Sequence, residues 1–255
     1  MMQAAPTRRR DMALPSYRDL LTAVASGDLA TLRRVAASPD VGDRLQLVLQ
    51  PELPEPIIEE ICELESSALA AMISPTAPDG HAALAIAEVD AAAHSLVLCI
   101  ALARLPAATP EGLAALAGDT HKEVRAAVAA HPAAERDVLW DLLRGGPGEV
   151  WLALAENPAL PGDFAARLVD GKWEYEDAID YTPAVRERLA RNPSTPPSVL
   201  ASLAIKARAC DEDLTALAAN PNTPDSTLEA LACGADRFVA AAATEELTVR
   251  WRSSA

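Results

Sequence analysis

The histidines are the residues best suited to metal binding, but their spacing does not form a metal site. They lie at His81, His94, His121 and His131, within a stretch of 51 residues that also holds Cys99. Two ligands share one face of a helix when they are three or four residues apart, and no pair here has that spacing or a zinc-ribbon pattern. We therefore predict that the chain has no metal site.

Carboxylates are the other abundant reactive groups. Adjacent pairs such as Glu59-Glu60 and Glu245-Glu246 are common in this acidic chain, and solvated helix faces explain them. The sequence contains no phosphate-binding loop, nucleophile elbow or catalytic triad signature. The expectation is a protein with no catalytic residue and no cofactor.

The acidic charge is unevenly distributed along the chain. The formal net charge is −15, and residues 1–45 contribute +2 while the remainder carries −17. An acidic body repels nucleic-acid phosphates and anionic membranes and favours a basic partner. The alternative is that this charge serves solubility alone.

The composition predicts short helices. Half of the residues are apolar, only 4% are aromatic, and there are twenty prolines. Ala and Leu favour helices, whereas proline interrupts them, so each helix must end near a proline. The turn prolines of the predicted units are 24 to 35 residues apart, at Pro51, Pro75, Pro106, Pro132, Pro158, Pro193 and Pro221.

The clearest copies of this unit show a recurring helix–turn–helix pattern. Residues 185–204 read VRERLARNPSTPPSVLASLA and residues 214–232 read LTALAANPNTPDSTLEALA, and weaker forms cover 124–143 and 150–169. The first helix ends at a residue expected to take the left-handed conformation that closes helices. These structural turn residues are Asn157, Asn192 and Asn220, with His131 in the equivalent place.

A Thr-Pro pair follows the turn in three copies, at Thr109, Thr195 and Thr223. Thr is expected to cap the second helix, and Pro suits its first position. Asp163 and Asp225 then fall in the first turn, where the helix dipole favours negative charge. A pair of leucines three residues apart completes each second helix and predicts a buried stripe.

The unit V-x-x-x-L-A-x-N-P-x-T-P-x-x-x-L-x-x-L-A resembles the variant leucine-rich repeat. That resemblance is strong over residues 120–235 and fair over 50–119. It implies an all-α, right-handed solenoid of about seven repeats, each an α-helix paired with a shorter α- or 3₁₀-helix, similar to HEAT and armadillo arrays. Some members of the family carry an iron–sulfur segment before the repeats, but the first 61 residues here lack cysteine, so that cofactor is not expected.

The ends of the chain differ from the repeats. Residues 1–14 are basic and expected to be disordered, and residues 15–45 are expected to form a helical cap around Gly27. Repeats are assigned to 46–235, and 236–255 is interpreted as a capping half-repeat. In that half-repeat, Phe238 to Trp251 would close the core, with Arg250 and Arg252 on its outer edge.

The longest insertion, residues 171–183, mixes aromatic and acidic side chains. Trp and Tyr are frequent interface anchors, and insertions in repeat arrays often lie on one binding face. The candidate binding residues in and before this insertion are Trp140, Trp151, Trp173, Tyr175 and Tyr181. The alternative is that these rings fill a local hydrophobic gap.

The function predicted from these features is a non-enzymatic scaffold that binds a protein or peptide, expected to be basic. The alternative is a HEAT-like nucleic-acid-binding module or an enzyme of the DNA glycosylase type, which the acidic charge disfavours. No secretory signal or membrane span is recognised, so the expected location is the cytoplasm. The thiols of Cys62, Cys99, Cys210 and Cys233 are expected to be reduced and buried there.

Overall fold

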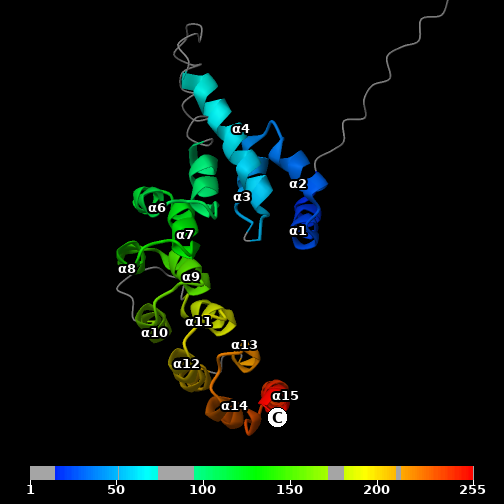
Figure 1. Ribbon diagram of the computed structural model, residues 1–255, viewed down its shortest axis with the longest axis vertical. Helices are drawn as coiled ribbons and strands as arrows, with labels where there is room; N and C mark the ends of the chain where they lie inside the picture. The colour runs from blue at the N-terminus through cyan, green and yellow to red at the C-terminus, as the bar shows by residue number, and fades with distance from the viewer. Residues whose placement is uncertain (1–14, 51, 74–94, 172–180, 211–213, 255) are drawn as a thin grey trace, which may run out of the picture. The chain divides into compact units, whose positions relative to one another are not determined.

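The computed structural model describes residues 15–50, 52–73, 95–171, 181–210 and 214–254, and these parts contain helices and no strand (Figure 1). The all-α class predicted from the sequence is confirmed for the described residues. By contrast, no 3₁₀-helix occurs among them, because Ala- and Leu-rich segments are strong α-helix formers. The chain forms two compact units, Met1–Leu105 and Pro106–Ala255.

The first unit is organised around its second helix, α2, which contacts α1, α3 and α4. Its helices are α1 (Tyr17–Ser26), α2 (Leu29–Ala36), α3 (Val41–Val48), α4 (Glu55–Ile73) and a further helix over residues 95–104. The predicted N-terminal helical hairpin is present. Gly27 closes α1 in the left-handed conformation with φ of 67°, and the Asp28 carboxylate accepts hydrogen bonds from the first amides of α2.

A buried ion pair joins α3 to α4 in this unit. The Arg44 guanidinium pairs with the Glu65 carboxylate and also donates to the carbonyl of Ser38. Both side chains are almost fully buried, at 7% and 0% exposed. A second arginine, the partly buried Arg104, donates to the carbonyl of Val48, and burial lowers the pKa of Arg104 to about 10.

The second unit consists of helices in two neighbouring series (Figure 1). The first series contains α7 (Lys122–Ala130), α9 (Gly148–Glu156), α11 (Thr182–Arg191), α13 (Thr215–Ala219) and α15 (Arg237–Ser254). The second contains α6 (Pro110–Leu116), α8 (Arg136–Gly145), α10 (Gly162–Asp170), α12 (Pro197–Cys210) and α14 (Asp225–Ala232). Each member of the first series contacts the next one, from α7 through α15.

Helices of this unit end where the sequence predicts. Pro106, Pro132, Pro158, Pro193 and Pro221 all lie in turns between helices, whereas Pro51 and Pro75 fall outside the described residues. The predicted leucine stripes are also buried. Leu200 and Leu203 are 0% and 2% exposed, and Leu228 and Leu231 are similarly buried. Aliphatic side chains from both series therefore form the core of this unit.

Candidate interaction surfaces

Three buried asparagines link successive helices of the second unit. The side-chain amide of Asn192 donates to the carbonyls of Ala155 and Asn157, at 2.9 and 3.0 Å. Asn157 does the same toward Ala129 and His131, and Asn220 toward Ala190 and Asn192. We call Asn157, Asn192 and Asn220 the asparagine ladder, because each one binds the backbone of the preceding turn.

The ladder asparagines correct one prediction. They were expected in the left-handed conformation, but all three are extended, with φ between −63° and −77° and ψ between 115° and 126°. The proline after each asparagine disfavours helical conformations at the residue before it. Each ladder asparagine is instead the first residue of a β-turn. Its carbonyl accepts a hydrogen bond from the amide three residues later, as in the 3.1 Å bond from the Thr195 amide to the Asn192 carbonyl.

The threonines correct a second prediction. Thr109 caps α6 as expected, with its hydroxyl accepting from the Gly112 amide. The hydroxyls of Thr195 and Thr223 do not cap the following helices. They donate to Leu189 and Leu217, each at 2.6 Å, and so satisfy carbonyls at the end of the preceding helix.

The two ends of the ladder use other residues. His131 occupies the first turn, is also extended with ψ of 129°, and accepts from the Ala133 amide through its Nδ1. Arg250 on α15 serves the last turn. Its guanidinium donates to the carbonyls of Thr223 and Pro221, at 2.7 and 2.8 Å, and pairs with Asp225. Arg250 was predicted on the outer edge, but it faces the ladder because only a long forked donor reaches these carbonyls from a helix.

Two of the predicted binding aromatics pack against the fold, Trp151 fully and Tyr181 in part. Trp151 is 6% exposed and donates its indole N–H to the Leu143 carbonyl at 3.2 Å. The Tyr181 ring lies over Gly148, where a Cβ would collide with the ring. Both rings therefore have a packing role in the described structure. Trp173 and Tyr175 lie outside the described residues, and their binding role stays a prediction.

Trp140 is the candidate that lies at the surface. Its partly exposed ring on α8 packs against Phe164 of α10, with ring centroids 5.3 Å apart. The Arg167 guanidinium lies 4.8 Å from the Trp140 centroid, and Arg136 lies 4.6 Å from that of Phe164. The surface of α8 and α10 therefore combines aromatic rings with arginine side chains in cation–π contact.

An acidic stripe runs along α4 in the first unit. Glu55, Glu59 and Glu63 are four residues apart, which places them on one helix face, and all three are exposed. None of the three forms an ion pair within the described part of the chain. Burial, followed by the charge of Glu59, raises the pKa of the neighbouring Cys62 thiol to about 11. We call Glu55, Glu59 and Glu63 the glutamate stripe.

Exposed ion pairs connect neighbouring helices in the second unit. Lys122 pairs with Glu149 at 2.5 Å, and this hydrogen bond is the main cause that lowers the pKa of Glu149 and raises the pKa of Lys122. Arg136 and Asp163 form a similar pair at 2.6 Å between α8 and α10. Because these side chains are exposed, such pairs add little stability, and the surface around them carries both positive and negative charges.

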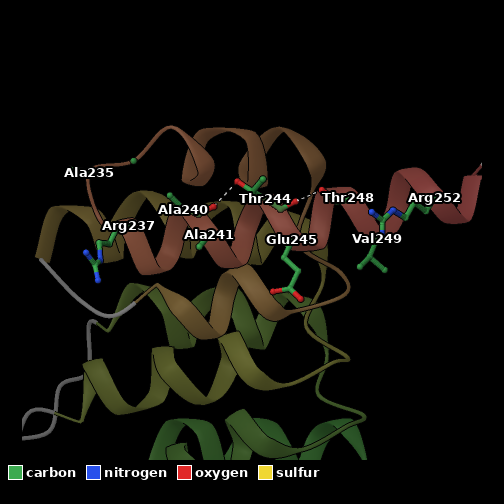
Figure 2. A pocket seen from close by; sticks show the side chains of 10 residues that line it. Ala235, Arg237, Ala240, Ala241, Thr244, Glu245, Thr248, Val249 and Arg252 are labelled. Carbon is green, nitrogen blue, oxygen red and sulfur yellow. Dashed lines mark hydrogen bonds between the residues drawn. The ribbon is translucent and has the colours of Figure 1, made fainter.

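The last helix, α15, exposes large apolar side chains. It packs on α13 and α14, with Val239 and Ala243 buried. Phe238 and Trp251, which were expected to help close the core, are instead 68% and 84% exposed, because they point away from the buried face. Figure 2 shows the outer face of α15, where residues from Arg237 to Arg252 line a shallow groove.

The described residues offer neither a metal-binding group nor a membrane-spanning helix. Among the described residues, no group of three His, Cys, Asp or Glu side chains could hold a metal ion, and no helix is long and apolar enough to cross a membrane. The expectation of buried thiols is wrong for Cys233, which is exposed, and Cys62 and Cys99 are only partly buried. Cys233 follows the last turn of α14, where its side chain reaches solvent.

Comparison with known proteins adds no further constraint. No family model, no curated protein and no solved structure matches the chain.

Proposed function

We propose that the chain is a non-enzymatic scaffold that binds a basic protein or peptide. In this proposal, residues 46–235 form a right-handed α-solenoid of about seven repeats resembling the variant leucine-rich repeat, behind an N-terminal helical cap. The successive contacts from α7 to α15 and the asparagine ladder support such an arrangement for the second unit.

The glutamate stripe is the observation that carries the choice of partner. Like charges four residues apart destabilise a helix by a few tenths of a kcal/mol per pair, about 0.2–0.5 each. A basic segment lying along α4 would remove this repulsion and add hydrogen-bonded ion pairs. Leu64, which is 41% exposed beside Glu63, would supply an apolar contact at the same place.

Neutralising the stripe tests this proposal. The probe is a fluorescein-labelled peptide of alternating Lys and Arg, and its anisotropy is followed at 50 and 150 mM NaCl. The triple variant Glu55→Gln, Glu59→Gln, Glu63→Gln should bind at least tenfold more weakly, mainly through slower association. The same variant should be more stable by about 0.5–1 kcal/mol, because two repulsive pairs are removed.

A matched control separates the stripe from net charge. Glu111, Asp141 and Glu229 are exposed and dispersed over the second unit. Replacing them with Gln, Asn and Gln changes the net charge by the same amount and should leave peptide binding within about twofold of the wild type. Equal losses in both variants would show that general acidity attracts the peptide and that the stripe is not a site.

A gel shift addresses the nucleic-acid alternative. Binding to phosphates is strongest at low salt, so a nucleic-acid-binding module should retard duplex DNA at 50 mM NaCl. The scaffold proposal expects no retardation under these conditions.

A further inference from the structure

The exposed face of α15 is lined by side chains that complement one another. Glu245 and Arg252 both lie on this face, and neither forms an ion pair within the described residues. They are seven residues apart, which is nearly two helical turns and about 10.5 Å along the axis. A second groove, of about 540 Å³, lies on the flank toward α14 and is lined by Thr244, Leu247 and Trp251.

We propose that two copies of this chain associate through α15, antiparallel and around a two-fold axis that passes between Thr248 and Val249. Glu245 of each copy is then level with Arg252 of the other copy, which gives two symmetric ion pairs. This charge complementarity is why the second copy, and not another partner, is the proposed occupant.

Trp251 supplies the apolar anchor of the same arrangement. Because the two-fold axis lies in the plane of contact between the helices, a given flank of α15 is on the same side of the dimer in both copies. The Trp251 ring of one copy is therefore level with residue 246 of the other and lies on the same flank as the groove lined by Thr244 and Leu247. In this arrangement the exposed indole packs beside that groove and removes apolar surface from water.

The size of the contact predicts a weak dimer. The shared length of α15 is only about twelve residues, and one face of so short a helix offers less than the area of about 800 Å² per partner that a stable complex buries. The net charge of −15 also opposes association when salt is low. We therefore expect a dissociation constant in the range of tens of micromolar at 0.15 M NaCl.

Sedimentation velocity from 2 to 300 µM protein tests the dimer. The wild type should shift from monomer to dimer across this range, and Trp251→Ala should weaken dimerisation at least thirtyfold. Phe238→Ala removes an equally prominent exposed ring from the same helix outside the pairing region, so it should leave the equilibrium unchanged. A wild type that stays monomeric at 300 µM would overturn the proposal, as would a Trp251→Ala variant that still dimerises.

A charge swap tests the orientation. Glu245→Arg alone and Arg252→Glu alone should each weaken the dimer about tenfold, because like charges then face each other. The double variant Glu245→Arg, Arg252→Glu should restore the dimer, since the pairing is reversed. Failure of the double variant to recover, with helix content unchanged by circular dichroism, would rule out this antiparallel arrangement.

Discussion

The two units bury polar side chains between helices, but they use different chemistry to do so. In the first unit, the charged pair Arg44 and Glu65 lies between α3 and α4. In the second unit, the neutral amides of the asparagine ladder bind backbone carbonyls, and the hydroxyls of Thr195 and Thr223 bind the ends of helices. The three side chains of the asparagine ladder are therefore uncharged, and the charged Arg250 binds the turn that follows Asn220.

This difference matters because the second unit uses the same kind of link at three successive turns. Burying a charge requires an accurately placed partner and costs several kcal/mol of desolvation per ion. A buried amide needs only hydrogen bonds, and each turn of the ladder provides two carbonyls and one amide for them. A neutral link can therefore recur at successive turns, whereas the buried ion pair of Arg44 and Glu65 needs a partner placed for it alone.

Removing one member of the charged pair should have the largest effect. Arg44→Met leaves the carboxylate of Glu65, 0% exposed, without its guanidinium partner. We expect a loss of about 3–5 kcal/mol in the free energy of unfolding. Native-state hydrogen exchange should show faster exchange in α2, α3 and α4, with the amides of α9 and α11 unchanged.

The double variant Arg44→Met, Glu65→Leu serves as the control. An apolar pair of similar size carries no desolvation penalty, so most of the lost stability should return. If the double variant is as unstable as the single one, then packing and not the unpaired charge causes the loss.

Most of the helix pattern could be predicted from the sequence, because it depends on local chemistry. Gly27 and Asp28 set the first hairpin, and the five described turn prolines each separate two helices. The buried leucine pairs follow from three-residue spacing. The prediction for the ladder asparagines is wrong, because the proline that follows each of them disfavours helical conformations at the residue before it.

The candidate surfaces were harder to predict, because exposure depends on contacts far apart in the sequence. Trp140 and Trp151 both stand among Val and Leu residues in the sequence, yet one ring is partly exposed and the other is buried. The sequence predicts that Trp251 helps to close the core, but the structure leaves it 84% exposed, whereas Val239 on the same helix is buried. The four-residue spacing from Glu55 to Glu63 was visible in the sequence and could have identified the glutamate stripe.

Breaking one neutral link should have an intermediate effect. Asn192→Ala removes two donated hydrogen bonds and one accepted from the Ser194 amide. Leaving buried carbonyls unsatisfied should lower the free energy of unfolding by roughly 2–3 kcal/mol, measured by urea denaturation.

Asn192→Gly distinguishes the two explanations for this residue. If Asn192 were needed for a left-handed conformation, glycine would replace it at little cost. Because the structure gives it a hydrogen-bonding role in an extended conformation, glycine should be at least as destabilising as alanine. A glycine variant with the stability of the wild type would contradict the ladder.

The smallest effect is expected at Arg250, where the two kinds of chemistry meet. Its guanidinium is charged, like that of Arg44 in the first unit, but it binds the backbone carbonyls of Thr223 and Pro221. Its side chain is still 24% exposed. Arg250→Met keeps much of the apolar stem and loses the donors, while water can still reach the freed carbonyls. The loss in the free energy of unfolding should therefore be about 1–2 kcal/mol.

Arg250→Lys keeps the charge without the planar fork. If charge near Asp225 and Glu246 is what stabilises α15, lysine should behave like the wild type. If the forked hydrogen bonds are what matter, lysine should resemble methionine, and hydrogen exchange should accelerate in α13 and α15 while α7 stays protected. We expect the second result, because exposed ion pairs contribute little and the carbonyls of Pro221 and Thr223 need donors directed at both.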